Sequence, residues 1–261
     1  MLNGKSRKPA RRRVPIITYH SIDESGSVIS TPLNVFKRQI STLAMAGYSA
    51  ITLREFVAGM GNGNSLPERV VVLTFDDGFK NFYAEAFPIL NDHGFRATVF
   101  LVTDFCGKHN DWAGNPPELP RSEILNWSEV RELSEKGVEF GSHTRTHPDL
   151  TRTSDAAMED EIVNSKSALD DALGSETASF AYPFGRINDA AKRMVADNFK
   201  AAVSTVLGKV TSSSDLFSLE RVDSYYLSDQ RIFDRIETSS FDNYMRVRQV
   251  LRNAKALAVR A

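Results

Sequence analysis

VVVLTFDDG, residues 70–78, is the stretch that decides the fold class. Its first six residues, VVVLTF, are apolar except for Thr74, which predicts a strand buried on both faces, as in parallel sheets covered by helices. Asp76 and Asp77 follow at the C-terminal end of this strand. That end is where α/β barrels and doubly wound sheets carry their catalytic residues. The stretch therefore predicts an α/β protein with a site at this pair of carboxylates.

The rest of the chain alternates between strand and helix. Apolar residues at helical spacing, often followed by a terminating glycine, predict helices at residues 33–45, 79–93, 126–136, 154–173 and 188–198. Short apolar runs predict further strands at residues 14–19, 97–102, 138–141, 179–182, 201–204 and 219–222. This order predicts either an α/β barrel or an open doubly wound sheet.

The chain divides into three segments. Residues 1–13 are basic and predict a disordered, solvated arm, with docking to anionic lipid as the alternative. Residues 14–228 form one predicted domain, and residues 229–261 a helical extension that packs on it. An apolar stripe on that extension could also meet another subunit, so the oligomeric state stays open. The stripe comprises Tyr244, Val247, Val250, Leu251 and Leu257.

Composition excludes several classes of protein. The net charge of −1 gives no global field that would favour nucleic acid. The single cysteine, Cys106, excludes an intrachain disulfide and a cysteine-rich zinc site. No apolar stretch approaches the roughly 18–20 residues of a transmembrane helix. The basic N-terminus is not followed by the apolar segment of a secretory signal, so we expect a cytoplasmic protein.

The Asp76–Asp77 pair could be an ordinary turn ended by Gly78. However, two like charges at the end of a buried strand repel each other, and a nearby cation relieves that repulsion. A second motif, SHTRTH at residues 142–147, also follows a short predicted strand. Its histidines, His143 and His147, lie close enough to share one ion if the segment is helical or tightly turned.

Together the two motifs supply two imidazoles and a carboxylate. With an open position for water, such a set makes a hydrolytic metal site, and the second aspartate is then placed to act as a base. A third motif, YPFG at residues 182–185, follows another predicted strand. Its fixed turn could aim the backbone N–H of Phe184 at a developing oxyanion, or it could be only a rigid loop.

The sequence resembles the polysaccharide deacetylase family, which includes chitin, peptidoglycan and nodulation-factor deacetylases. The resemblance covers about residues 14–225. TFDDG at 74–78 and SHTxxH at 142–147 are similar to the two metal-site motifs of the family, YPFG to its third motif, and LNW at 125–127 to its fourth. The opening PIITYHSI at 15–22 is similar to the branch with exopolysaccharide poly-N-acetylglucosamine deacetylases.

The resemblance implies a distorted (β/α)7 barrel in one domain. It also implies that Asp77, His143 and His147 hold one divalent metal ion and that Asp76 is the general base. Zinc suits this set of ligands, although cobalt or nickel could serve. The implied reaction removes acetyl groups, as acetate, from N-acetylglucosamine-type units of a polysaccharide, oligosaccharide or glycolipid.

The chain departs from the family pattern at two places. Many members carry an arginine in the third motif that contacts the base, but Ala181 stands there in this chain. We expect Arg221 to replace it, with Arg186 as the alternative. The late histidine that supplies the general acid in many members is also absent. His20 ends the first predicted strand, on the catalytic face of a barrel, so we expect it to be the acid.

Three aromatic residues are candidates for binding substrate: Trp127, Tyr182 and Phe184, each of which could instead be a core residue. The segment 104–121, which contains Trp112, predicts a long loop near the site. Two other functions remain open, since a fold does not fix its substrate. One is a related metal-dependent amide hydrolase, such as a deformylase or a ring amidase, and the other is a carbohydrate-binding relative without activity.

Overall fold

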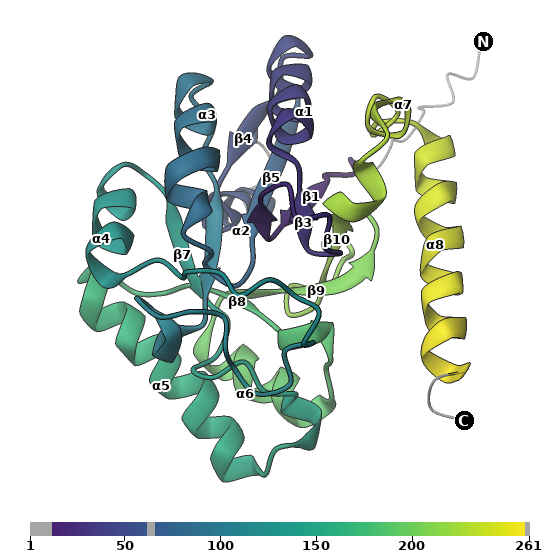
Figure 1. Ribbon diagram of the computed structural model, residues 1–261. Coiled ribbons are helices and arrows are strands. Elements are labelled where there is room, and N and C mark those ends of the chain that lie inside the picture. Colours follow the sequence, from purple (N-terminus) through teal and green to yellow (C-terminus); the bar gives the residue numbers. More distant parts are fainter. Residues whose placement is uncertain (1–11, 62–65, 259–261) are drawn as a thin grey trace, which may run out of the picture.

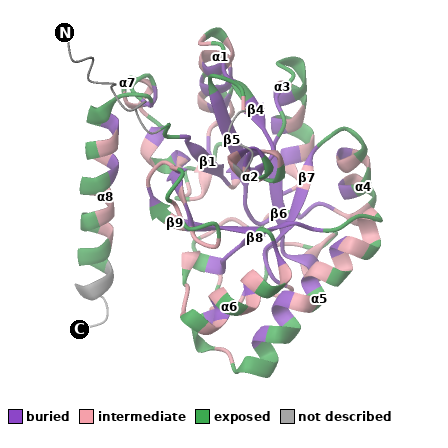
Figure 2. Cartoon of the chain, turned by 180° about the vertical axis from the view of Figure 1, so that it is seen from behind, coloured by how far each residue is buried: buried purple, intermediate pink, exposed green. Residues whose placement is uncertain are grey.

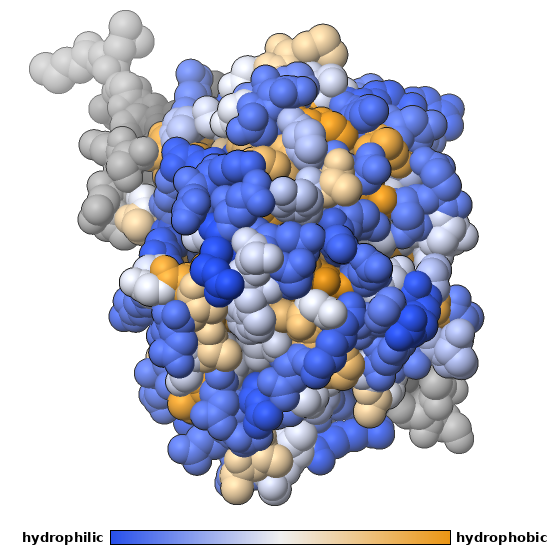
Figure 3. Space-filling model, turned by 60° about the vertical axis from the view of Figure 1, so that its left-hand side comes forward, coloured by the Kyte–Doolittle hydropathy of each residue, from blue (hydrophilic) through white to orange (hydrophobic). Residues whose placement is uncertain are grey.

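The computed structural model describes residues 12–61 and 66–258 (Figure 1). The predicted basic arm therefore lies outside the described residues except for Arg12 and Arg13. Within the described ranges, no helix is long and apolar enough to cross a membrane. Apolar side chains form small patches in a mostly hydrophilic surface on the face seen in Figure 3.

The central element is a closed barrel of seven parallel strands. In order around the barrel they are β1 (Ile16–Tyr19), β5 (Val70–Phe75), β6 (Thr98–Leu101), β7 (Glu139–Ser142), β8 (Ser179–Ala181), β9 (Ala201–Leu207) and β10 (Leu219–Asp223). Pairing of β1 with both β5 and β10 closes the ring. This confirms the barrel and excludes the open sheet. An eighth strand, β4 (Ser49–Ile51), pairs with the first half of β5 from outside the ring.

Helices surround the barrel, and they are buried chiefly on the faces turned towards it (Figure 2). They are α1 (Leu33–Met45), α2 (Leu53–Gly61), α3 (Phe87–Asp92), α4 (Trp127–Glu135), α5 (Asp155–Leu173) and α6 (Asp189–Asn198). A π-helical turn, Phe82–Ala86, leads into α3. The sequence did not predict β4, α2 or the small pair of strands β2 (Ser21–Ile22) and β3 (Ser30–Thr31). Strands of two or three residues are too short to show a period.

The helices begin at the polar residues expected of N-caps. The Asn126 side chain accepts hydrogen bonds from the first turn of α4 and forms a capping box with Glu129. Ser154 caps α5, and Asn188 caps α6. At the end of α5, Gly174 adopts a left-handed conformation (φ 63°), which costs glycine little because it has no Cβ.

The C-terminal segment forms α7 (Gln230–Phe233) and α8 (Ser239–Ala258). Helix α8 lies beside the barrel and packs against β9 (Figure 1). Its inner face buries Phe241 and Met245. Of the predicted stripe, Tyr244 packs partly on the core, whereas Val247, Val250 and Leu251 are exposed, and the side chain of Leu257 lies outside the described residues.

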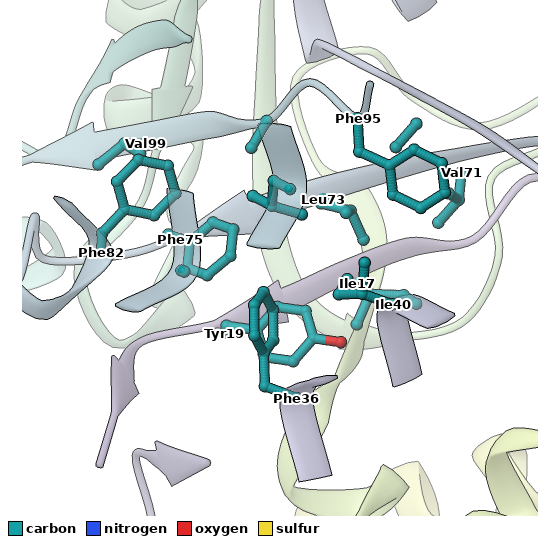
Figure 4. Packing of buried hydrophobic residues seen from close by; sticks show 14 of the residues in the cluster. Ile17, Tyr19, Phe36, Ile40, Val71, Leu73, Phe75, Phe82, Phe95 and Val99 are labelled. Carbon is teal, nitrogen blue, oxygen red and sulfur yellow. The ribbon is translucent and has the colours of Figure 1, made fainter. Parts of the chain in front are cut away.

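Alternation along the strands divides the apolar residues between two sides of the barrel wall. Ile17, Tyr19 and Phe75 face outward and pack with Phe36 and Ile40 of α1 (Figure 4). The alternate positions, among them Ile16, Val72 and Phe100, form an interior cluster that α2 also contacts. Continuing the same alternation towards the C-terminal ends brings Thr18, Thr74 and Asp76 inward. The barrel interior thus becomes polar at the end where the site lies.

Candidate active site

The turn after β5 separates the two neighbouring carboxylates. Asp77 and Gly78 both adopt left-handed backbone conformations, with φ of 72° and 76°. A Cβ on Gly78 would lie 2.4 Å from the Leu101 side chain, so glycine is required at this position. The turn lets Asp76 face Arg221 and Asp77 face the two histidines. Each carboxylate therefore meets cationic or metal-ligating groups instead of the other carboxylate.

His143 and His147 lie in a loop at the C-terminal end of β7, not in a helix. Their ring centroids are 4.7 Å apart because the loop turns tightly, with left-handed Thr144 and His147 at φ of 68° and 61°. The Nε2 atoms of His143 and His147 lie 3.5 and 3.6 Å from the same oxygen of Asp77, Oδ1. The structure therefore brings the three predicted ligands together.

The cluster of Asp77, His143 and His147 fits a divalent metal ion. One ligand atom from each residue lies within 4.8 Å of the others, and all three residues are buried. The Nδ1 atom of His143 donates to the Ala181 carbonyl at 2.8 Å, in the tautomer that leaves Nε2 free for a metal. Nδ1 of His147 is buried without a hydrogen-bond partner among the described residues. Two imidazoles and one carboxylate are the donor set of catalytic zinc sites.

The surroundings shift the pKa values of two of the three ligands, His147 and Asp77, towards the forms that bind a cation. Burial, with the nearby His143, lowers the pKa of His147 to about 3, so His147 is a neutral imidazole. Burial alone would raise the pKa of Asp77, but the hydrogen bond with His143 outweighs burial, and the pKa is lowered. The site thus offers an ionised carboxylate beside a neutral imidazole, the forms that bind metals.

Glu161 of α5 holds the turn between the two histidines. Its Oε2 accepts hydrogen bonds from the backbone N–H groups of Arg145 and Thr146, both at 2.9 Å. Its Oε1 accepts from the Thr146 hydroxyl at 2.6 Å. Sequence reasoning missed this residue, because a glutamate in a polar helix gives no signal of what it will face.

Asp76 is held by Arg221 from inside the barrel. Two guanidinium nitrogens donate to the two carboxylate oxygens, each at 2.7 Å. Thr18, Thr74 and the Ser204 carbonyl accept the remaining hydrogen bonds of Arg221, which is only 1% exposed. Burial alone would raise the pKa of Asp76, but the charge and hydrogen bonds of Arg221 hold that pKa well below its usual range.

The structure therefore distinguishes between the two candidates for the arginine that the third motif lacks. Arg221 occupies the expected contact with Asp76, whereas Arg186 pairs with Asp149 at the surface. His20 lies beside the same aspartate, with Nε2 3.8 Å from Asp76 Oδ2 and its side chain 22% exposed. Its place next to both Asp76 and solvent suits proton transfer, although its role as an acid stays a prediction.

The predicted substrate-binding aromatics take different places. Phe184 is 40% exposed, and its ring lies 4.6 Å from that of His147, so it forms part of the wall of the site. Tyr182 is 1% exposed and donates its hydroxyl to the Phe217 carbonyl, which places it in the interior. Trp127 packs partly buried on the main core. The binding roles of these three residues stay predictions.

A tryptophan of the long loop at 104–121 also reaches the site. The Trp112 ring is buried, and its centroid lies 5.1 Å from that of His147. This contact confirms that the loop lies near the candidate ligands. The sequence does not identify Trp112 as a site residue, because one aromatic in a polar loop does not show which way its side chain faces.

Strained backbone conformations occur in the TFDDG, SHTRTH and YPFG motifs. Within the described residues, the non-glycine residues with positive φ are Asp77, Thr144, His147 and Phe184. Such conformations cost on the order of 1–3 kcal/mol each and persist only where the surroundings enforce them. Their confinement to the TFDDG, SHTRTH and YPFG segments indicates that the chain is shaped for a function at this end of the barrel.

Comparisons with known proteins identify the family of the chain. Residues 63–201, more than half of the chain, match the family model of polysaccharide deacetylases. A Bacillus subtilis protein, YxkH, which carries a provisional polysaccharide deacetylase name, is 28% identical over 220 residues, or 84% of this chain and 73% of that protein. The poly-beta-1,6-N-acetyl-D-glucosamine N-deacetylase of Escherichia coli is 28% identical over 141 residues, but this match covers only 20% of the E. coli protein.

A solved structure shows the same fold. The deacetylase PplD of Streptococcus pyogenes, solved in complex with acetate, superposes with a TM-score of 0.73 at 28% identity. The match covers 82% of this chain and 93% of that one. The chain therefore belongs to the polysaccharide deacetylase family, whose members are hydrolases that act on carbon–nitrogen bonds other than peptide bonds.

Proposed function

We propose that the chain is a metal-dependent N-deacetylase that releases acetate from N-acetylglucosamine-type units of a glycan. The observation that carries the proposal is the buried cluster of Asp77, His143 and His147 directly beside Asp76. A carbohydrate-binding protein without activity would have no use for a base that Arg221 keeps ionised next to a complete set of metal ligands.

Asp76 is the proposed general base. Arg221 fixes both of its oxygens and keeps the carboxylate ionised, while each oxygen retains a lone pair that can accept a proton. A divalent ion held by Asp77, His143 and His147 would act as a Lewis acid and lower the pKa of water at this site. Asp76 takes the proton from the water as its oxygen adds to the acetamide carbonyl.

Two further groups complete the reaction. Phe184 lies in a tight turn, with φ of 57°, and its ring is 4.6 Å from that of His147. Its backbone N–H is the proposed donor to the oxyanion that develops on the carbonyl oxygen. His20 is the proposed acid, which protonates the sugar nitrogen as the carbon–nitrogen bond breaks. Acetate and a free amine on the sugar are then the products.

The substrate class rests on the relatives. The E. coli protein is named as a deacetylase of poly-beta-1,6-N-acetyl-D-glucosamine, and 141 of its residues match this chain at 28% identity. An amide hydrolase with another substrate, such as a deformylase or a ring amidase, is the alternative, because the ligands and the base would serve either reaction.

The test is product analysis after incubation of purified protein with N-acetylglucosamine oligomers and with other amides. We expect acetate to appear with added zinc or cobalt and to disappear with a chelator. Release of formate or of ammonia instead would move the assignment to another amide hydrolase. Bound metal without any product from these substrates would overturn the proposed substrate and leave the metal site standing.

A further inference from the structure

A groove of ≈ 380 Å³ lies beyond the C-terminal end of β10 and takes no part in the proposed reaction. Three tyrosines, one arginine and several hydroxyl groups line it, principally Thr31, Ser224, Tyr225, Tyr226, Tyr244 and Arg248. Its volume falls in the range of small-molecule binding sites. The groove joins the loops after β1 and β10 to helix α8 of the C-terminal extension.

The chain topology places this groove on the catalytic face. Thr18 of β1 pairs in register with Asp223 of β10, so His20 and Ser224 both emerge at the same end of adjacent strands. The segment after His20 continues through β2 to β3, where the Thr31 hydroxyl lies 3.1 Å from that of Ser224. This buried contact ties the two loops together. The groove therefore lies at the same end of the barrel as the proposed acid.

The lining has the character of a sugar-binding surface. Tyr225 is 55% exposed and stands edge-on to Tyr226, with ring centroids 5.2 Å apart. Such rings present a flat apolar face with a hydroxyl at the rim, which suits the apolar face and hydroxyl groups of a sugar ring. Polar groups around such apolar faces would fix the orientation of a ligand.

Arg248 is held in place without an acidic partner. Its guanidinium lies over the rings of Tyr226 and Tyr244, at 5.4 and 5.2 Å from their centroids, and its Nε donates to the Tyr244 hydroxyl at 3.1 Å. None of the ion pairs found in the described part of the chain involves Arg248, and no carboxylate lines the groove. Guanidinium donors are thus positioned over aromatic rings at the edge of an open groove.

We propose that this groove binds sugar units of the glycan that neighbour the unit being deacetylated. The proposal rests on the proposed function. Among the described residues that line the groove, only Arg248 is charged, so the groove favours units that still carry a neutral acetamide over units with a protonated amine. The enzyme would therefore act better on longer, acetylated chains, and α8 would help to set that preference.

The experiment compares kcat/KM for the chitin pentamer with that for the dimer in wild type, Tyr225→Ala and Arg248→Met. Each variant should lower the pentamer-to-dimer ratio about fivefold to tenfold, mainly by raising KM for the pentamer. Val247→Ala is the matched control, because Val247 is 58% exposed on the same helix and does not line the groove. This control should keep the wild-type ratio.

A binding measurement separates this inference from the proposed function. In an Asp76→Asn background, titration calorimetry should show that Tyr225→Ala weakens the pentamer by the same factor. Acetate release with an unchanged ratio in both groove variants would overturn the inference and leave the deacetylase intact. Pentamer binding that depends on Tyr225, without acetate release from any glycan, would overturn the reaction but keep the groove. If neither acetate release nor pentamer binding that depends on Tyr225 were observed, the proposed reaction and the proposed groove would both be wrong.

Discussion

Arg221 donates hydrogen bonds to both carboxylate oxygens of Asp76, each at 2.7 Å, although 145 residues separate the two in the chain. The family pattern places this arginine in the third motif, where this chain has Ala181. Here it comes from β10 and enters through the barrel interior. The same contact can thus be made from another strand because every strand of the barrel ends at one face.

Substitutions at Arg221 and Asp76 are expected to have coupled effects on the free energy of unfolding. Replacing Arg221 by methionine leaves Asp76 buried without its cation, which should lower the free energy of unfolding by about 3–5 kcal/mol. The double variant Arg221→Met/Asp76→Asn removes the stranded charge and should be more stable than Arg221→Met alone. Urea unfolding at neutral pH with a chelator present measures both. A double variant that merely sums the two single losses would contradict the coupling.

Asp76→Asn tests the base without disturbing the ligands. Asparagine keeps the size of the side chain but cannot take up the proton, so kcat should fall by about 10² to 10⁴. The metal content, measured by mass spectrometry of the dialysed protein, should stay near that of wild type. Full activity in this variant would show that another group accepts the proton.

Glu161→Gln tests the support of the histidine loop. Glutamine has one acceptor oxygen where glutamate has two, so part of the hydrogen bonding to Arg145 and Thr146 is lost. Loss of such outer support typically weakens metal affinity about 10- to 100-fold. A metal titration against a competing chelator gives the affinity. Glu159→Gln, an exposed change on the same helix, should keep the wild-type affinity for metal. Equal metal affinities in all three proteins would show that Glu161 does not support the site.

His20→Ala separates an acid from a residue that only shapes the pocket. Cleavage of an amide needs a proton on the departing nitrogen, whereas an aryl acetate ester has a leaving group that departs without one. The variant should therefore lose much more activity on an acetylated sugar than on the ester. Equal losses on both substrates would assign His20 to the shape of the pocket.

The sequence predicted the features that follow from local pattern. The apolar run before Asp76 identified a buried strand, and apolar residues at helical spacing identified α5 and α6. The proximity of Asp77 to the two histidines was predictable as well. Asp77 and the histidine segment both follow strands whose C-terminal ends lie on one face of the barrel.

The remaining features depend on contacts between distant segments. Strand β4 is three residues long and pairs only because β5 offers an open position beside β6. Glu161 and Trp112 face the site because of how α5 and a long loop pack, which no period in the sequence encodes. The interior position of Tyr182 likewise involves a contact between distant segments, the hydrogen bond from its hydroxyl to the Phe217 carbonyl.

The central claim is that one divalent ion at Asp77, His143 and His147 supports acetate release. The most direct test is to titrate metal-free protein with zinc or cobalt and to measure acetate released from N-acetylglucosamine oligomers against bound metal, in wild type and in His143→Ala. We expect activity to rise with metal occupancy and to saturate at one ion per chain, and His143→Ala to lose metal and activity together. Acetate release that persists without metal, or that survives in His143→Ala, would contradict this claim.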